Sequence, residues 1–164
     1  NHLLEQGCTK IGHICGPLHL AVSRERYLGY EDVCAAKEWF LPSLVVQSDF
    51  HVEGGYRAML ELMTRHPDID GVFAGNDLMA VGALKALYEK GRKVPDDVKL
   101  IGFDGISLQM VVPELSTIAQ PIYDIGSIAM EYLLKLIRGD EVHEHVHELD
   151  VKLVARLSSL RTMK

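Results

Sequence analysis

The chain has 164 residues, 48% of them hydrophobic and 24% charged, which fits one domain with a buried core. No apolar run approaches the ~20 residues that a membrane span needs, so a membrane protein is not predicted. The net charge of −6 and the lack of a dense Lys/Arg stretch argue against direct contact with nucleic acid.

The first two thirds of the sequence alternate short apolar runs with longer amphipathic segments. The opening residues 2–7 resemble the last turn of a helix that begins upstream. Strands that alternate with helices form right-handed βαβ units, so we expect an α/β fold with a doubly wound parallel sheet. The expected strands are 11–15, 44–46, 71–74 and 98–103, and the expected helices are 24–38, 52–65 and 77–90.

The last third departs from this alternation. A short extended piece is expected at 116–120, with Pro121 after it. A long amphipathic helix is expected at 122–138, where apolar residues recur at helical spacing and Gly139 ends the pattern. A final strand is expected at 149–155.

Three histidines alternate with other residues between that helix and the final strand. An extended segment would place His143, His145 and His147 on one side, where three imidazoles could hold a transition metal. Glutamates flank the run in what we expect to be a surface connection. A solvated loop is therefore favoured, and no metal site is predicted.

Five side chains follow the expected strands near the points where the strands end. In an open parallel sheet, the loops beyond the carboxyl ends of the strands border one crevice, and ligands bind there. We therefore expect these side chains to meet at one edge of the sheet. They are Arg26, Phe50, Asn76, Asp104 and Gln120.

Each of these side chains also has an explanation that needs no ligand. Asn76, and Asp77 beside it, are favoured N-caps for the helix that follows. Asp104 could simply form a turn with the glycine after it. Phe50 could belong to the core, and Arg26 could lie solvated on its helix. The shared position of the set, rather than any one member, supports a site.

The chemistry of this set suits a neutral polyol. An arginine fork donates to adjacent hydroxyls, a carboxylate accepts from two hydroxyls, and amides do both. An aromatic face covers the C–H side of a sugar ring. The sequence has no GxSxG elbow, no GxGxxG motif and no P-loop, so we expect no catalytic residue and no cofactor.

Several longer stretches have the spacing of a known family. They are residues 11–17 (IGHICGP), 23–30 (SRERYLGY), 72–87 (VFAGNDLMAVGALKAL), 91–104 (GRKVPDDVKLIGFD) and 113–121 (PELSTIAQP). With these stretches, which run nearly end to end, the sequence resembles the lactose/galactose repressor family of bacterial transcription regulators.

The resemblance implies a DNA-binding head joined to a two-lobed sensor, similar to periplasmic sugar-binding proteins, that closes on a small effector. It implies a homodimer in the cytoplasm that binds operator DNA only through the head. The residues that it implies for effector contact are again Arg26, Phe50, Asn76, Asp104 and Gln120. This set is similar to that of ribose-type repressors, so a pentose or similar monosaccharide is expected.

The sequence departs from the family because the head and almost all of the N-terminal lobe are absent. We expect residues 1–164 to form the C-terminal lobe of the sensor, a lobe of the periplasmic-binding-protein-like type. By the resemblance, residues 121–140 form a crossover helix that packs on the missing lobe. Without that lobe, we expect this helix to fold onto another copy of the chain or to be poorly ordered.

Two other functions are compatible with parts of this sequence. A sugar-binding protein of a transport system would share the fold and the pocket, but no signal peptide is visible at Asn1. The three singly spaced cysteines favour free thiols in a reducing compartment, which supports the repressor. A doubly wound hydrolase or metal enzyme would use Asp49, Asp104 and the histidines, and we do not expect one.

Overall fold

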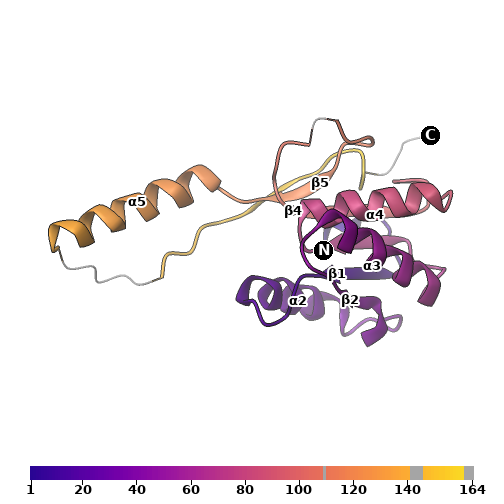
Figure 1. The fold of residues 1–164 in the computed structure, drawn as a ribbon. Coiled ribbons are helices and arrows are strands. Elements are labelled where there is room, and N and C mark those ends of the chain that lie inside the picture. The colour runs from indigo at the N-terminus through magenta and orange to yellow at the C-terminus, as the bar shows by residue number, and fades with distance from the viewer. Residues whose placement is uncertain (109, 141–145, 161–164) are drawn as a thin grey trace.

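The computed structural model describes residues 1–108, 110–140 and 146–160, and its centre is a six-stranded sheet (Figure 1). The strand order is β2-β1-β3-β4-β5-β6, and all neighbours are parallel except β5 and β6. The doubly wound parallel sheet expected from the sequence is thus confirmed. The strands are β1 (Ile11–Cys15), β2 (Val45–Gln47), β3 (Gly71–Ala74), β4 (Lys99–Asp104), β5 (Ser116–Ala119) and β6 (Lys152–Val154).

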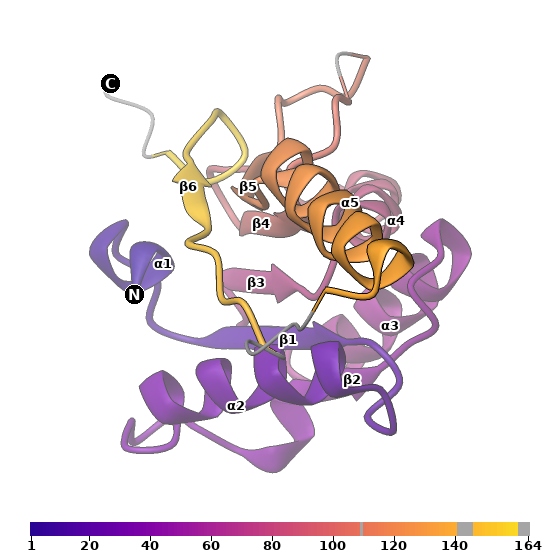
Figure 2. The ribbon, with the colours of Figure 1, turned by 90° about the vertical axis from the view of Figure 1, so that its left-hand side faces the viewer.

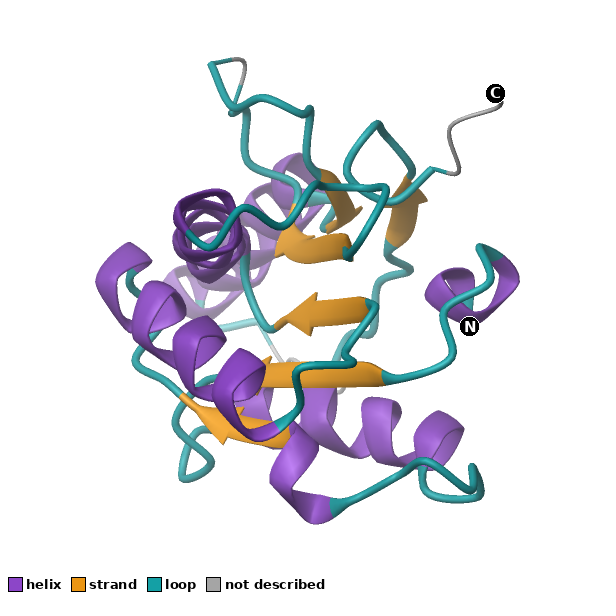
Figure 3. Cartoon of the chain, turned by 90° about the vertical axis from the view of Figure 1, so that its right-hand side faces the viewer, coloured by secondary structure: helices purple, strands orange, loops and turns teal. Residues whose placement is uncertain are grey.

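The helices cover the two faces of the sheet unequally. They are α1 (His2–Glu5), α2 (Ala21–Cys34), a 3-10 turn η1 (Pro42–Leu44), α3 (Val52–Arg65), α4 (Asp77–Glu89) and α5 (Ile122–Arg138). The α2 crossover leads from β1 to β2, whereas α3 and α4 lead across the sheet in the opposite direction. Because right-handed crossovers in opposite directions use opposite faces, α2 lies on one face and α3 with α4 on the other (Figures 2 and 3).

The bounds of β1, α3, β3 and α5 are those expected from the sequence. The largest difference is α2, which runs from Ala21 to Cys34 rather than from 24 to 38. A turn follows this helix, in which the amide of Lys37 donates to the carbonyl of Cys34. The turn brings Trp39 and Phe40 against the buried apolar clusters, so tertiary packing decides where the helix ends.

The alternating histidines receive no structural test, because His143 and His145 lie outside the described residues. The ring of His147 is described and lies edge-on to Tyr132, with 6.4 Å between the centroids. Within residues 1–108, 110–140 and 146–160, no group of three or more His, Cys, Asp or Glu could hold a metal ion. In the same ranges, no helix has the length and hydropathy to cross a membrane.

The α5 helix stands away from the sheet and packs on none of the other helices (Figure 1). None of its residues is buried. Tyr123 is 86% exposed and Ile137 is 71% exposed, and the apolar stripe between them faces solvent as well. The expectation that this helix packs on a second lobe or on another copy of the chain stays a prediction.

The α3 and α4 helices approach each other closely because glycines lie where they cross. A Cβ on Gly55 would overlap the backbone of Met79, and a Cβ on Gly82 would overlap the carbonyl oxygen of Val52. This contact encloses the larger apolar cluster, which includes the fully buried Met59. The core on this face therefore depends on the absence of two side chains.

His13 on β1 is fully buried between the rings of Tyr30 and Phe73, whose centroids lie 5.1 and 4.7 Å away. Its Nδ1 lies 2.8 Å from the carbonyl oxygen of Phe73, to which it donates in the neutral ring. Its Nε2 has no hydrogen-bond partner among the described residues. Burial lowers the pKa of His13 to about 4, although the bond to Phe73 raises it. The ring is therefore neutral in the folded protein.

Replacing Gly82 by Ala is expected to destabilise the protein by about 1–3 kcal/mol, because the new methyl group forces α3 and α4 apart. Urea unfolding measures this change. The matched control is Gly29→Ala on α2, where nothing lies within 4 Å of the added Cβ. That substitution is expected to stabilise by about 0.5–1 kcal/mol. Equal effects at both positions would contradict the close helix contact.

The stability of the protein is expected to fall with acid through His13. The unfolded chain protonates this ring near pH 6.5, whereas the folded ring stays neutral down to about pH 4. The contribution is complete above pH 6.5 and is lost as the pH falls toward 4, by up to about 3 kcal/mol. Urea unfolding between pH 4 and 7 is expected to show a shallower pH dependence in His13→Phe. Equal slopes in the two proteins would show that His13 is not the group responsible.

Candidate ligand-binding site

The parallel strands bring the residues that follow them to one edge of the sheet. Asp104 is the last residue of β4, and Gln120 follows β5 directly. Asn76 follows β3 and is the N-cap of α4. Arg26 comes from the second turn of α2, and Phe50 lies in the loop between β2 and α3. The five side chains predicted as a site thus come from five different segments.

The guanidinium of Arg26 connects the ends of β3 and β4. Its Nη1 donates to the carbonyl oxygen of Gly75 at 2.6 Å, and its Nη2 donates to Oδ1 of Asp104 at 3.2 Å. It also stacks on the ring of Phe103, with its central carbon 3.9 Å from the centroid. Burial lowers the pKa of Arg26 and the Asp104 carboxylate raises it, but the group stays cationic at neutral pH. Arg26 is therefore not a solvated helix residue.

Asp104 sits in a sharp reversal of the backbone. Its φ is 113°, and that of Gly105 is 79°, so both residues adopt left-handed conformations. Oδ1 of Asp104 accepts a second hydrogen bond, from Nε2 of Gln120 at 2.8 Å. In the part of the chain that the structure describes, no group donates to Oδ2. One carboxylate oxygen is thus held in place, and the other can accept hydrogen bonds from a ligand.

Asn76 connects the start of α4 to the loop after β2. Its Oδ1 accepts from the amide of Met79 at 2.8 Å, and its Nδ2 donates to the carbonyl oxygen of Phe50 at 3.0 Å. Phe50 has a φ of 67°, and its ring packs over Gly16, where a Cβ would overlap it. The interpretation of Asn76 as a helix cap is confirmed, and the second hydrogen of its amide has no acceptor among the residues that the structure describes.

Hydrogen bonds therefore run without a break from Gln120 through Asp104 and Arg26 to the Gly75-Asn76 peptide, and from Asn76 to Phe50. The structure brings all five predicted residues together at one edge of the sheet. Their contact with a sugar stays a prediction.

Asp77 has a role that sequence reasoning missed. It was interpreted as a possible cap, but Asn76 is the cap, and the carboxylate of Asp77 turns to the β4–β5 loop. Its Oδ2 accepts from the amides of Gly105 and Ile106, both at 2.9 Å, and its Oδ1 accepts from Oγ1 of Thr117 at 2.7 Å. Burial raises the pKa of Asp77 above its ordinary value, and these hydrogen bonds offset only part of that rise. A local pattern could not reveal these partners, because they lie far along the chain.

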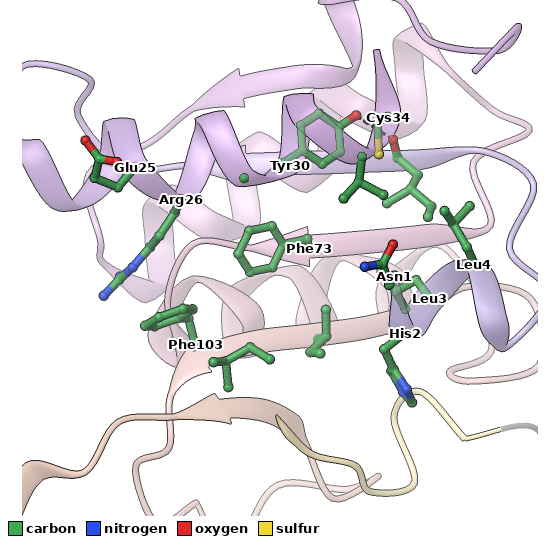
Figure 4. A pocket seen from close by; sticks show the side chains of 15 residues that line it. Asn1, His2, Leu3, Leu4, Glu25, Arg26, Tyr30, Cys34, Phe73 and Phe103 are labelled. Atoms are coloured by element: carbon green, nitrogen blue, oxygen red, sulfur yellow. Dashed lines mark hydrogen bonds between the residues drawn. The ribbon is translucent and has the colours of Figure 1, made fainter. Parts of the chain in front are cut away.

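An apolar pocket of about 450 Å³ lies next to this edge, between α2, α1 and the strands β1, β3, β4 and β5. Figure 4 shows Arg26 and Phe103 at one end of the pocket and Asn1, Leu3 and Leu4 at the other. Of the five predicted residues, it includes only Arg26. Because its lining is mostly apolar, the pocket does not offer the donors and acceptors of a sugar site.

The sheet order and the polar cluster beyond its strand ends define an α/β ligand-binding domain. The chain belongs to the family described as periplasmic binding protein-like domain, whose model matches residues 1–159. The relatives that match are repressors of the lactose/galactose type, so the family relationship predicted from the sequence motifs is confirmed.

The ribose operon repressor of Halalkalibacterium halodurans is 42% identical to this chain over 156 residues, which are 94% of the chain and 46% of that protein. The transcriptional regulator CelR in complex with cellobiose superposes with a TM-score of 0.89 and 34% identity, over 95% of this chain and 48% of CelR. The lac repressor dimer bound to operator and an anti-inducer superposes with a TM-score of 0.87 and 27% identity, over 98% of this chain and 48% of that protein. The chain spans about half the length of the curated relatives it matches.

Replacing Asn76 by Ala is expected to cost about 1–2 kcal/mol of stability, because α4 loses its cap and the Phe50 carbonyl loses its donor. Asn76→Asp retains the cap acceptor but cannot donate to Phe50, so a smaller loss is expected. Urea unfolding compares the two variants. Thr64→Ala on the exposed side of α3 is the control, with a change expected below about 0.5 kcal/mol. A loss in Asn76→Asp as large as in Asn76→Ala would contradict the capping role.

Proposed function

We propose that this chain is the C-terminal lobe of the effector-sensing region of a transcription repressor, and that the effector is a sugar. The observation that carries the proposal is the carboxylate of Asp104. Arg26 and Gln120 hold its Oδ1, and its Oδ2 is open to a ligand. A carboxylate fixed in this way accepts charge-assisted hydrogen bonds from neighbouring hydroxyls.

The expected effector is a pentose or a similar monosaccharide. Arg26 donates from a planar fork, and Asn76 and Gln120 can each donate and accept, which matches hydroxyls that also do both. Among the described residues, no lysine joins the cluster and its arginine is already paired with Asp104, so a phosphorylated ligand is not favoured. The similarity to the ribose operon repressor, and to a regulator in complex with cellobiose, supports a saccharide.

The proposed mechanism is closure of two lobes on the effector, as predicted from the family resemblance. The site lies at an open edge of this lobe, so a ligand bound there has a side left for a second lobe to cover. An effector that binds the closed arrangement more tightly shifts the equilibrium toward it, typically with 1–3 kcal/mol of coupling. The two heads of the dimer then gain or lose affinity for the operator.

Under this proposal, the second lobe and the DNA-binding head lie in the part of the longer protein that this chain does not cover, since the chain matches 46% of the ribose operon repressor. We propose that α5 crosses to the second lobe, because none of its residues is buried and its aliphatic side chains such as Leu136 and Ile137 are 62% and 71% exposed. The similarity to the lac repressor dimer on its operator supports a homodimer that binds DNA through the head.

The buried cysteine thiols favour a binding function over an enzyme, because they are protonated and therefore poor nucleophiles. Burial raises the pKa of Cys8 to about 12 and that of Cys15 to about 11, so neither thiol is ionised at neutral pH. The carboxylates of Asp77 and Asp104 are engaged in hydrogen bonds that orient loops. The repressor relatives support the same conclusion.

We place the protein in the cytoplasm, where operator DNA is found and where buried free cysteines stay reduced. The sugar-binding protein of a transport system, the alternative considered from the sequence, is not favoured because the matching relatives are repressors.

The test is calorimetric titration of a monosaccharide panel into the complete two-lobed protein. We expect one pentose or a similar sugar to bind best. Asp104→Ala is expected to abolish this binding, and Arg26→Ala to weaken it by about 100-fold, because each removes charge-assisted hydrogen bonds. The 164-residue chain alone is expected to bind weakly or not at all, because half of the pocket wall is missing.

The matched control is Asp68→Ala, which removes an exposed carboxylate before the start of β3, at the opposite edge of the sheet. Its sugar affinity is expected to equal that of the wild type. If Asp104→Ala and Arg26→Ala also bind the best sugar like the wild type, the assignment of the site is wrong.

A further inference from the structure

The two residues that start α4 hold the two sides of the candidate site. Asn76 is bonded to the loop after β2, whereas Asp77 is bonded to the loop after β4 and to β5. Asp77 is 1% exposed, so it lies beneath the edge and does not reach a ligand there. Asp77 is therefore a buried support beneath the site, whereas the five residues of the site lie at the edge where a ligand would bind.

The backbone that carries Asp104 needs such support. A non-glycine residue with a φ of 113° is in a sparsely populated conformation, which persists only where the surrounding structure imposes it. The two amides directly after Asp104, those of Gly105 and Ile106, both donate to the same oxygen of Asp77. These bonds fix the direction of the chain just where Asp104 leaves the strand.

The surroundings of Asp77 are shaped for its carboxylate. Oγ1 of Thr117, which is 1% exposed, donates to its other oxygen at 2.7 Å and itself lies 3.2 Å from the amide of Gly105. Gly102 on β4 faces the same carboxylate, and a Cβ there would overlap Oδ1 of Asp77. Three donors and one missing side chain thus accommodate a buried charge that would otherwise be costly.

From this geometry we propose that Asp77 is the positioning residue of the site: through the amides of Gly105 and Ile106, it holds the left-handed reversal at Asp104 and Gly105 that orients the Asp104 carboxylate toward the ligand. The inference rests on the proposed function, because it names the residue on which the sugar contact of Asp104 depends. Asp77 acts only through Asp104 and makes no contact with the sugar itself.

The experiment uses the complete protein and the sugar that binds it best, together with the monodeoxy analogues of that sugar. The hydroxyl that contacts Asp104 is identified as the one whose removal costs affinity in the wild type but not in Asp104→Asn. In Asp77→Asn, which keeps the shape but cannot accept from all three donors, we expect about tenfold weaker binding of the parent sugar. We also expect the preference for that one hydroxyl to be lost and the other preferences to be kept.

The matched control is Ser158→Ala. Ser158 is fully buried, accepts from the amide of Ser116 and donates to the carbonyl of Leu100, toward the opposite ends of β4 and β5. Its loss is expected to lower the melting temperature while leaving the affinity and the hydroxyl preferences unchanged. A role for Asp77 in stability alone would give this same pattern.

A second pair of variants covers the case in which Asp77→Asn does not fold. Thr117→Val removes one of the three donors and is expected to shift the same hydroxyl preference by a smaller factor, whereas Thr117→Ser restores it. If the wild type binds a sugar and Asp77→Asn and Thr117→Val both keep its affinity and preferences, the inference is overturned and the proposed function stands. If the wild type binds no sugar of the panel, both are overturned.

Discussion

The parallel pairing of β1, β3, β4 and β5 is the constraint on which the candidate site depends. Parallel strands end at one edge, so the residues after them meet although they are far apart along the chain. Arg26 then joins these ends through Gly75, Asp104 and Phe103. A partly buried ion pair alone gains little stability, because desolvation offsets the attraction. The additional bonds fix the position of the charges, which is what selective recognition of hydroxyls requires.

The loops at this edge are held in backbone conformations that side chains rarely adopt. Phe50 and Asp104 are the non-glycine residues with positive φ in the described part of the chain. The start of α4 holds both of them. Asn76 donates to the carbonyl oxygen of Phe50, and Asp77 accepts from the amide of Gly105, the residue directly after Asp104. Such conformations persist where the surroundings impose them, and they are common at ligand sites. The N-terminus of α4 therefore organises both sides of the site.

Two apolar surfaces fit the proposal that this chain is one lobe of a larger sensor. The α5 helix has no buried residue, although its sequence has the periodic apolar stripe of a helix that packs. The apolar pocket beside α2 is bordered at its far end by the residues of α1. Contiguous exposed apolar surfaces commonly mark sites of contact with another domain or protein. The α5 helix follows β5 at the carboxyl edge of the sheet, where the proposed second lobe would close.

The sequence by itself determined the α/β class, the bounds of β1, α3, β3 and α5, and which five side chains gather at the sheet edge. Those features follow from local periodicity and from a general rule about parallel strands. Only the tertiary structure decided that α2 ends at Cys34 and that Asp77 supports the loop of Asp104 rather than capping its helix. Both depend on contacts between segments that become neighbours through the strand order, and no local pattern of residues encodes such contacts.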